Sequence, residues 1–263
     1  MTELPHQSFQ EALTQGRGEG VLVAVLDSGI ASNHPHFAKA KFEEQISPNL
    51  KLEEGCQREK LSDNLGHGTA VAGIIHQLAP DARLLSIRVL KGGAMKDRHK
   101  LIQLGIKEAL RRGASIINCS FGSPAASFTF PLYKQWTDQA FDQGVPVVTA
   151  SSNTDPLAPE WPSAFRTTLA TTDAQLISND LRFRGGSIPF AAAGIEIEVP
   201  TPDGGTAVRT GSSFAAAHLT GQLARLLSVH PELSPSYLRE ILTYHASKSE
   251  RSPRLRKSQS GSR

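Results

Sequence analysis

The sequence predicts an α/β protein, a three-layer αβα sandwich around a mostly parallel, doubly wound β-sheet. Short apolar runs rich in β-branched residues recur without clean alternation, which is typical of strands buried on both faces. Amphipathic helical stretches lie between these runs, and this alternation favours right-handed βαβ connections. Because such sheets bind ligands beyond the carboxyl ends of their strands, we expect functional residues directly after an apolar run.

Four apolar runs are expected to form strands of this sheet. They span residues 21–27, 82–90, 114–122 and 145–151.

Four further stretches are expected to be helices. The first ends at Gly113, the second ends at Gly144, and the last begins with Ser234 as N-cap and Pro235 in its first turn. The apolar face of the first consists of Leu101, Ile102, Gly105, Ile106, Ala109 and Leu110. The four helices are expected at about 100–113, 131–144, 213–229 and 234–246.

Composition indicates a soluble globular protein, since 39% of the 263 residues are hydrophobic and 20% are charged. The net charge is only +3, and the basic excess lies in residues 247–263. We expect one folded domain at 1–246 and a disordered basic tail or linker at 247–263, whose Ser, Pro and charge content cannot build a core. A basic tail without aromatics is more often a linker than a nucleic-acid site, so neither a nucleic-acid nor a membrane partner is expected.

The start of the chain favours a cytoplasmic protein. Residues 1–20 lack the basic and apolar regions of a signal peptide, and no apolar run approaches the ~20 residues needed to span a bilayer. The two cysteines are Cys119, in an apolar run, and Cys56, in a polar stretch, so free thiols are expected.

Asp27 directly follows the first apolar run, in the string D-S-G. A carboxylate held there by the backbone N–H groups of a turn can orient an imidazole ring. A turn or capping aspartate is the alternative, and the tripeptide alone is weak evidence.

His67 lies between two glycines in G-H-G-T-A-V-A-G, just before a predicted helix of small residues. An imidazole near its reference pKa of ~6.5 can accept a proton at neutral pH and return it. The alternative is an exposed capping histidine.

Ser212 and Ser213 follow Gly211 at the start of another predicted helix. A hydroxyl there gains from the field of the helix N-terminus when negative charge develops on it, although a lone serine N-cap is common.

Together these strings resemble the subtilisin-like serine protease family, whose patterns are D-[ST]-G, G-H-G-T-x-V-A-G and G-T-S-M-A-x-P. The chain order Asp, His, Ser is that of subtilisin, and the resemblance runs from about Val21 to about Tyr244. It implies a subtilisin-like fold and a serine endopeptidase that works through an acyl-enzyme. Ser213, rather than Ser212, corresponds to the nucleophile, with His67 as its base and Asp27 orienting the ring.

The segment V-V-T-A-S-S-N-T-D resembles the family's A-A-G-N segment. The resemblance implies that Asn153 receives the oxyanion beside the backbone N–H of Ser213. Ala150, Ser151 and Ser152, in the same segment, are expected to contact substrate.

The segment I-N-C-S-F-G resembles the family's substrate-binding strand. Ser120, Phe121 and Gly122 would form the edge along which an extended peptide pairs by strand addition. Beside the specificity pocket, Trp161–Pro162 is a candidate cis peptide bond, and Asp155 is a weak indication of a preference for basic side chains.

The chain departs from the family pattern after the G-H-G-T motif. The family's oxygen-rich calcium loop is missing between that motif and A-P-D-A-R-L-L. Because calcium needs six to eight oxygen ligands, we expect no calcium at this site, no metal and no cofactor, and activity that survives a chelator.

The strand that carries Asp27 begins after only about twenty residues, so no propeptide is expected before it. We therefore expect a compact intracellular enzyme that processes one peptide or protein precursor in an extended conformation, similar to the peptidase domains of cyanobactin maturation proteins.

Three alternatives stay open. Ala217 stands where relatives usually have proline, and a shifted nucleophile would allow a peptide ligase or macrocyclase that uses the same acyl-enzyme. The others are a catalytically inactive peptide-binding homologue and a nucleic-acid-binding module that uses the basic tail.

Overall fold

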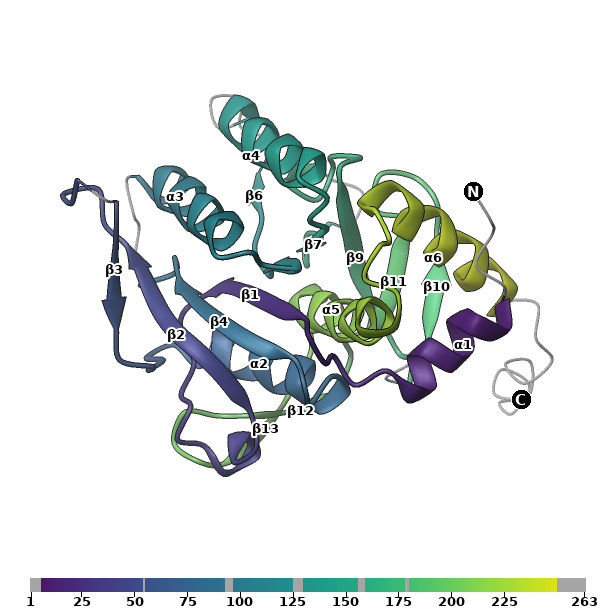
Figure 1. Ribbon diagram of the computed structural model, residues 1–263, viewed down its shortest axis with the longest axis horizontal. Coiled ribbons are helices and arrows are strands. Elements are labelled where there is room, and N and C mark those ends of the chain that lie inside the picture. The colour runs from purple at the N-terminus through teal and green to yellow at the C-terminus, as the bar shows by residue number, and fades with distance from the viewer. Residues whose placement is uncertain are drawn as a thin grey trace.

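The computed structural model describes residues 6–53, 55–92, 97–124, 130–155, 159–177 and 180–249. A nine-stranded sheet runs through this part of the chain in the order β10-β11-β9-β7-β5-β1-β4-β2-β3 (Figure 1). Its neighbouring strands are parallel except for the pairs β10–β11 and β2–β3. The strands are β1 (Leu22–Asp27), β2 (Lys41–Pro48), β3 (Cys56–Glu59), β4 (Arg83–Arg88), β5 (Ile116–Cys119), β7 (Val147–Ala150), β9 (Thr168–Ala174), β10 (Leu181–Phe183) and β11 (Phe190–Ala193).

Two antiparallel ribbons lie outside this sheet. One pairs β6 (Ser123–Pro124) with β8 (Glu160–Trp161), and the other pairs β12 (Ile197–Pro200) with β13 (Thr206–Arg209). The helices are α1 (His6–Gln15), α2 (His67–Leu78), α3 (Arg98–Arg111), α4 (Phe130–Asp142), α5 (Ser212–Val229) and α6 (Pro235–Ser249), with a short 3-10 helix at Pro35–Phe37.

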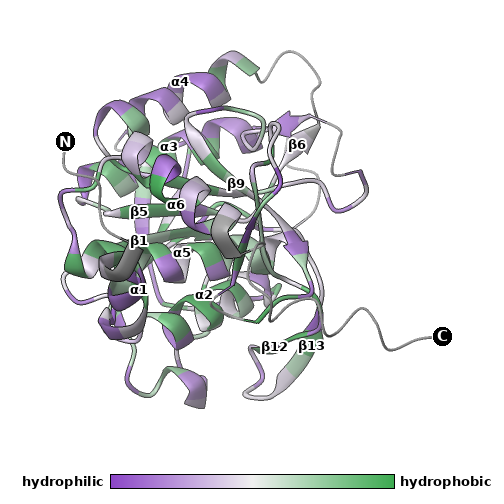
Figure 2. Cartoon of the chain, turned by 90° about the vertical axis from the view of Figure 1, so that its right-hand side faces the viewer, coloured by the Kyte–Doolittle hydropathy of each residue, from purple (hydrophilic) through white to green (hydrophobic). Residues whose placement is uncertain are grey.

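Helices cover both faces of the sheet, which confirms the predicted three layers (Figure 1). The alternation of side chains along β1 shows this directly. Val23 and Val25 join a core cluster with residues of α2 and α5, whereas Ala24 and Leu26 join a second cluster with residues of α3 and α4. Figure 2 shows hydrophobic residues concentrated in α2 and α5, while the outer helix α4 is mainly hydrophilic.

The predicted elements are present with modest shifts at their ends. Within the run 114–122 only β5 forms, because the chain leaves the sheet after Cys119, and the short strand β6 begins just beyond the run. The last helix continues to Ser249, beyond the predicted end near Ala246, and the rest of the predicted tail lies outside the described residues. Leu110, expected on the buried face of α3, is only half-buried.

Sequence patterns missed α1 and most of the edge strands. Phe9, Ala12 and Leu13 of α1 are buried in the cluster that contains α5, so tertiary packing stabilises this short N-terminal helix. The missed strands are β2, β3, β6 and β8 to β13, most of which are four residues or shorter.

Three smaller predictions are confirmed. Both cysteines are free, Cys119 is buried, and the Trp161–Pro162 bond is cis. Within the described ranges, none of the helices combines the length and the apolar character needed to cross a bilayer.

Candidate active site

The predicted site residues gather at the carboxyl edge of the sheet. Asp27 is the last residue of β1, Ser120 follows β5, and Ser151 follows β7. These three strands are neighbours and parallel, so their carboxyl ends meet at one edge.

Asp27 holds the imidazole of His67. The ring nitrogen Nδ1 lies 2.8 Å from Oδ1 and 2.9 Å from Oδ2 of the carboxylate. Asp27 is only 1% exposed, and its Oδ1 also accepts the backbone N–H of Ser28 at 2.7 Å. A carboxylate accepts and does not donate, so Nδ1 carries the proton and Nε2 of the neutral ring is left as a base.

Two glycines allow helix α2 to approach β1 so closely. Gly66, the residue before the helix, has φ 79°, and a Cβ on Gly68 would overlap the carbonyl oxygen of Gly29. The backbone N–H of Gly68 donates to the Ser28 hydroxyl at 2.9 Å. His67 is thus the first residue of the helix, whereas the sequence pattern placed it just before the helix.

Asp63 is a functional residue that the sequence analysis missed. Its buried carboxylate accepts the backbone N–H groups of Leu65, Gly66 and Thr69 at 2.9–3.0 Å and the Thr69 hydroxyl at 2.7 Å. It therefore caps α2 and fixes the helix that carries His67. The aspartate three positions before G-H-G was the available signal.

The pKa of His67 is raised above its usual 6.5. The negative charge of Asp27 is the main cause, its hydrogen bond and the charge of Asp63 add to it, and burial of the ring opposes it. The side chain is still 33% exposed, so the ring can exchange protons with solvent or with a bound molecule.

The two serines of α5 have different surroundings. The hydroxyl of Ser212 is fully buried and donates to the carbonyl oxygen of Ser151 at 2.7 Å. The hydroxyl of Ser213 is 3.1 Å from the carbonyl oxygen of Ser120 and donates to it. Ser212 is therefore committed to the interior, whereas Ser213 lies at the edge where the site residues meet.

Ser213 and His67 are both described, and no hydrogen bond joins the Ser213 hydroxyl to the imidazole. The start of α5 nevertheless reaches the ring, because the aromatic ring of Phe214 lies 6.0 Å from it between centroids. The structure thus brings Asp27 and His67 into contact and leaves the third member of the predicted triad turned toward Ser120.

Asn153 is oriented by the backbone of Ser212. Its Oδ1 accepts the backbone N–H of Ser212 at 2.8 Å. Because that N–H can only donate, the amide nitrogen Nδ2 points away from it and stays available as a donor on an exposed side chain.

A buried chain of hydrogen bonds holds the backbone of Ser213. Thr220 donates to Asn118 at 2.9 Å, Asn118 donates to the Ser120 hydroxyl at 2.9 Å, and that hydroxyl donates to the carbonyl oxygen of Ser213 at 3.1 Å. The chain ties α5 to β5. Sequence patterns gave no sign of it, because it joins residues about a hundred positions apart.

The other predicted substrate-binding residues have mixed exposure. Phe121 and Ala150 are buried, so their side chains belong to the core and only their backbones can face a ligand. The Ser152 hydroxyl accepts the backbone N–H groups of Thr154 and Asp155 and stabilises the turn around Asn153. Gly122 is half-buried.

Ala217 is fully buried within α5, which runs without a break from Ser212 to Val229.

A cavity of about 600 Å³ adjoins the imidazole of His67 on the side of the β12–β13 ribbon. Its walls include His67, Leu65, Pro202, Arg209 and Phe214, so a peptide group could lie beside the ring.

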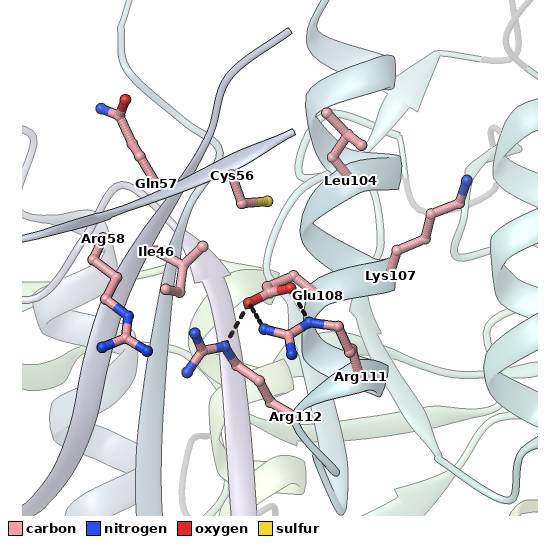
Figure 3. A pocket seen from close by; sticks show the side chains of 9 residues that line it. All are labelled: Ile46, Cys56, Gln57, Arg58, Leu104, Lys107, Glu108, Arg111 and Arg112. Carbon is pink, nitrogen blue, oxygen red and sulfur yellow. Dashed lines mark hydrogen bonds and ion pairs between the residues drawn. The ribbon is translucent and has the colours of Figure 1, made fainter. Parts of the chain in front are cut away.

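A second cavity, of about 820 Å³, lies between the β2–β3 hairpin and α3 (Figure 3). Arg111 and Arg112 both bind Glu108 there, and Arg112 also forms an ion pair with Glu44. Burial raises the pKa of the Cys56 thiol to about 11, which keeps it protonated at neutral pH. None of the predicted site residues lines this cavity.

Among the described residues, no group of three or more His, Cys, Asp or Glu side chains is placed to hold a metal ion. Helix α2 passes through Ala79 and a short turn into β4, without an intervening loop of acidic residues.

Comparisons with known proteins agree with this geometry. Residues 18–260 match the model of the subtilase family. The major intracellular serine protease of Bacillus subtilis (strain 168) is 30% identical over 236 residues, which cover 82% of this chain and 71% of that protein.

Solved structures share the fold. The S41 psychrophilic protease gives a TM-score of 0.72 at 25% identity, over 87% of this chain and 83% of that one. The prenylagaramide maturation protease PagA gives 0.65 at 24% identity, over 86% and 83%. The chain, with its subtilisin-like fold, therefore belongs to the subtilase family and is a serine endopeptidase.

Proposed function

We propose that the chain cleaves peptide bonds with a triad of Ser213, His67 and Asp27, through an acyl-enzyme on Ser213. The observation that carries this proposal is the paired hydrogen bond between the buried Asp27 carboxylate and His67 Nδ1, at 2.8 and 2.9 Å. It leaves Nε2 as the base for the serine hydroxyl, and later as the acid that protonates the leaving amine.

The hydroxyl of Ser213 must turn for this reaction. It now donates to the carbonyl oxygen of Ser120, and a step from one staggered rotamer to another moves it to a different side of its Cα–Cβ bond. Catalytic hydrogen bonds are often long or misaligned in a free enzyme and tighten when substrate binds. We propose that a bound peptide, by pairing with the Ser120 backbone, releases the hydroxyl toward His67.

Two donors would stabilise the tetrahedral intermediate. The backbone N–H of Ser213 lies at the N-terminus of α5, and Nδ2 of Asn153 is left available by the bond between Oδ1 and Ser212. The positive end of the helix dipole acts in the same direction.

We propose that the substrate is a peptide or protein precursor, bound as an extended strand along Ser120–Gly122. The likeness to a maturation protease supports processing rather than digestion. The intracellular relative and the two free cysteines support a place inside the cell, and residues 1–246 would form the peptidase domain.

A peptide ligase is the second candidate, and Ala217 is the observation that favours it. Proline at this position would remove a backbone N–H and crowd the preceding turn, whereas α5 here is an uninterrupted helix. If water reaches the acyl-enzyme slowly, an added amine captures it. Partitioning of one acyl-enzyme between water and an added amine decides between the two, since complete hydrolysis excludes the ligase.

Labelling with an organophosphorus reagent tests the triad directly. We expect one phosphorylated residue, Ser213, with labelling lost in Ser213→Ala and in His67→Ala but retained in Ser212→Ala. A folded wild-type protein that stays unlabelled would instead be an inactive peptide-binding homologue. Mass spectrometry of a peptide library digested by wild type and by Ser213→Ala then gives the cleavage sites.

A further inference from the structure

Glu160 places a carboxylate on the strip that is proposed to bind substrate. The residue lies in β8, which pairs with β6 immediately after Gly122, with Pro124 opposite Glu160. Gly122 has no side chain, and the Glu160 carboxylate oxygen occupies the space that a Cβ at this position would take. The charge is therefore held directly against the backbone of Gly122.

The backbone of Glu160 is fixed, and its charge is not neutralised. Its carbonyl oxygen accepts the backbone N–H of Ala164 at 2.9 Å and the hydroxyl of Ser163 at 3.0 Å. Its half-buried carboxylate has no hydrogen bond or ion pair with any other described residue. A partly desolvated carboxylate without a partner is unfavourable, and a cation supplied by a ligand would remove that cost.

Two cations of this region contact aromatic rings. Arg98 stands over the ring of Phe121, with its guanidinium carbon 5.8 Å from the ring centroid. Lys134 forms an ion pair with Asp138 and lies over the ring of Phe165. The Glu160 carboxylate is therefore placed to bind a positively charged group of a ligand.

The distance to the nucleophile suits one substrate residue. Ser120, whose carbonyl oxygen lies 3.1 Å from the Ser213 hydroxyl, is two residues before Gly122. Two residues of extended chain span at most about 7 Å. A long side chain on the residue whose carbonyl Ser213 attacks can thus run along this strip and bring its charged end to Glu160.

We propose that Glu160 makes this enzyme select a lysine or arginine on the acyl side of the scissile bond. This inference rests on the proposed function, because it takes Ser213 as the nucleophile. Arginine is the better fit, since its planar guanidinium can bind both carboxylate oxygens. The enzyme's precursor would then be cut after a basic residue, and the acyl group that reaches Ser213 would carry a positive charge.

The test uses peptides that differ only in the residue before the cleaved bond, which is arginine, lysine, norleucine or glutamate. Norleucine keeps the length of the lysine stem without its charge. In the wild type we expect kcat/KM to be at least about tenfold higher for arginine and lysine than for norleucine, and lowest for glutamate. Equal rates for lysine and norleucine would overturn the inference while leaving the proposed peptidase activity in place.

Three variants assign the preference to Glu160. Glu160→Gln keeps the shape and removes the charge, so the lysine preference should disappear while cleavage after norleucine is retained. Glu160→Arg should favour glutamate over lysine. Glu232→Gln removes an exposed negative charge whose side chain is 68% accessible, and the preference should stay unchanged. A lysine preference that survives in Glu160→Gln would assign it to another group and overturn the inference.

Binding of benzamidine to Ser213→Ala tests the subsite without catalysis. Calorimetry should give an affinity at least about tenfold lower when Glu160→Gln is added, and binding that weakens as salt is raised. If no peptide is cleaved and Ser213 stays unlabelled, the proposed function fails, yet this binding still reports on Glu160. Equal affinities of benzamidine for Ser213→Ala and for Ser213→Ala combined with Glu160→Gln would contradict the inference by themselves.

Discussion

The proposed base, His67, and the proposed nucleophile, Ser213, are held in different ways. His67 is fixed by hydrogen bonds to a buried carboxylate, and Asp63 caps the helix on which it lies. Ser213 is fixed only through its backbone, by the bonds that tie α5 to Ser120 and Asn153, while its hydroxyl rests on the Ser120 carbonyl. The proposed base, His67, is therefore already hydrogen-bonded to Asp27 before substrate binds. The hydroxyl of Ser213, the proposed nucleophile, is not yet turned toward the imidazole.

This difference has a physical reason. An imidazole next to a buried charge gains most when its orientation is fixed, because the carboxylate must be neutralised or hydrogen-bonded at all times. A serine hydroxyl is neutral, and its rotation costs little. Substrate binding can therefore complete the site by moving one atom, while Asp27 and His67 stay where they are.

The largest effect is expected for Ser213→Ala. We expect kcat to fall by about 10⁶-fold, the magnitude established for the nucleophile of subtilisin itself. Because the lost hydroxyl makes one hydrogen bond to a carbonyl, the thermal midpoint should change little. Peptide hydrolysis and thermal unfolding measure both. Comparable activity in Ser213→Ala and wild type would show that the triad assignment is wrong.

Removing the oxyanion donor should have an intermediate effect. Asn153→Ala is expected to lower kcat by about 10²–10³-fold with little change in KM, because Nδ2 acts when charge develops on the substrate oxygen. Steady-state kinetics measure the split between kcat and KM. Asn49→Ala, in a remote turn, is the matched control and should match the wild type. A change confined to KM would make Asn153 a ground-state contact instead.

The rise of kcat/KM on the acid side of the pH profile should report the loss of a proton from His67. The neutral ring is the base, and Asp27 and Asp63 raise the pKa of His67, so kcat/KM should rise with pH through a midpoint above 6.5. Asp63→Asn removes one of the raising charges and should move that midpoint to lower pH. Asp81→Asn, an exposed carboxylate paired with Arg17, is the control and should leave it in place. A midpoint that rises in Asp63→Asn contradicts the assignment.

The smallest effect is expected from a metal chelator. The chain lacks the family's oxygen-rich loop after α2, so incubation with EDTA should leave both activity and thermal midpoint unchanged. Activity assays with and without added calcium check this. A midpoint that falls with EDTA and recovers with calcium would place a metal site in this chain.

The sequence by itself determined the four central strands β7, β5, β1 and β4, every α-helix except α1, and the candidates for the reactive groups. Continuous apolar runs indicate strands buried on two faces, and each functional motif follows directly after such a run or opens a helix. Those signals are local, and the resemblance of the motifs to the subtilisin-like family is what assigned roles to Asp27, His67, Ser213 and Asn153. The short edge strands carry too few residues for such a pattern, and α1 is stable only where α5 covers it.

Only the tertiary structure decided how those groups are held. The contact of Ser213 with Ser120, the chain from Thr220 to Ser120, and the carboxylate of Glu160 against Gly122 each join segments that lie far apart in the sequence. Such contacts depend on which strands become neighbours and on which glycine lets a backbone or a charge come close. No local pattern encodes that proximity, because it arises only when the whole sheet is assembled.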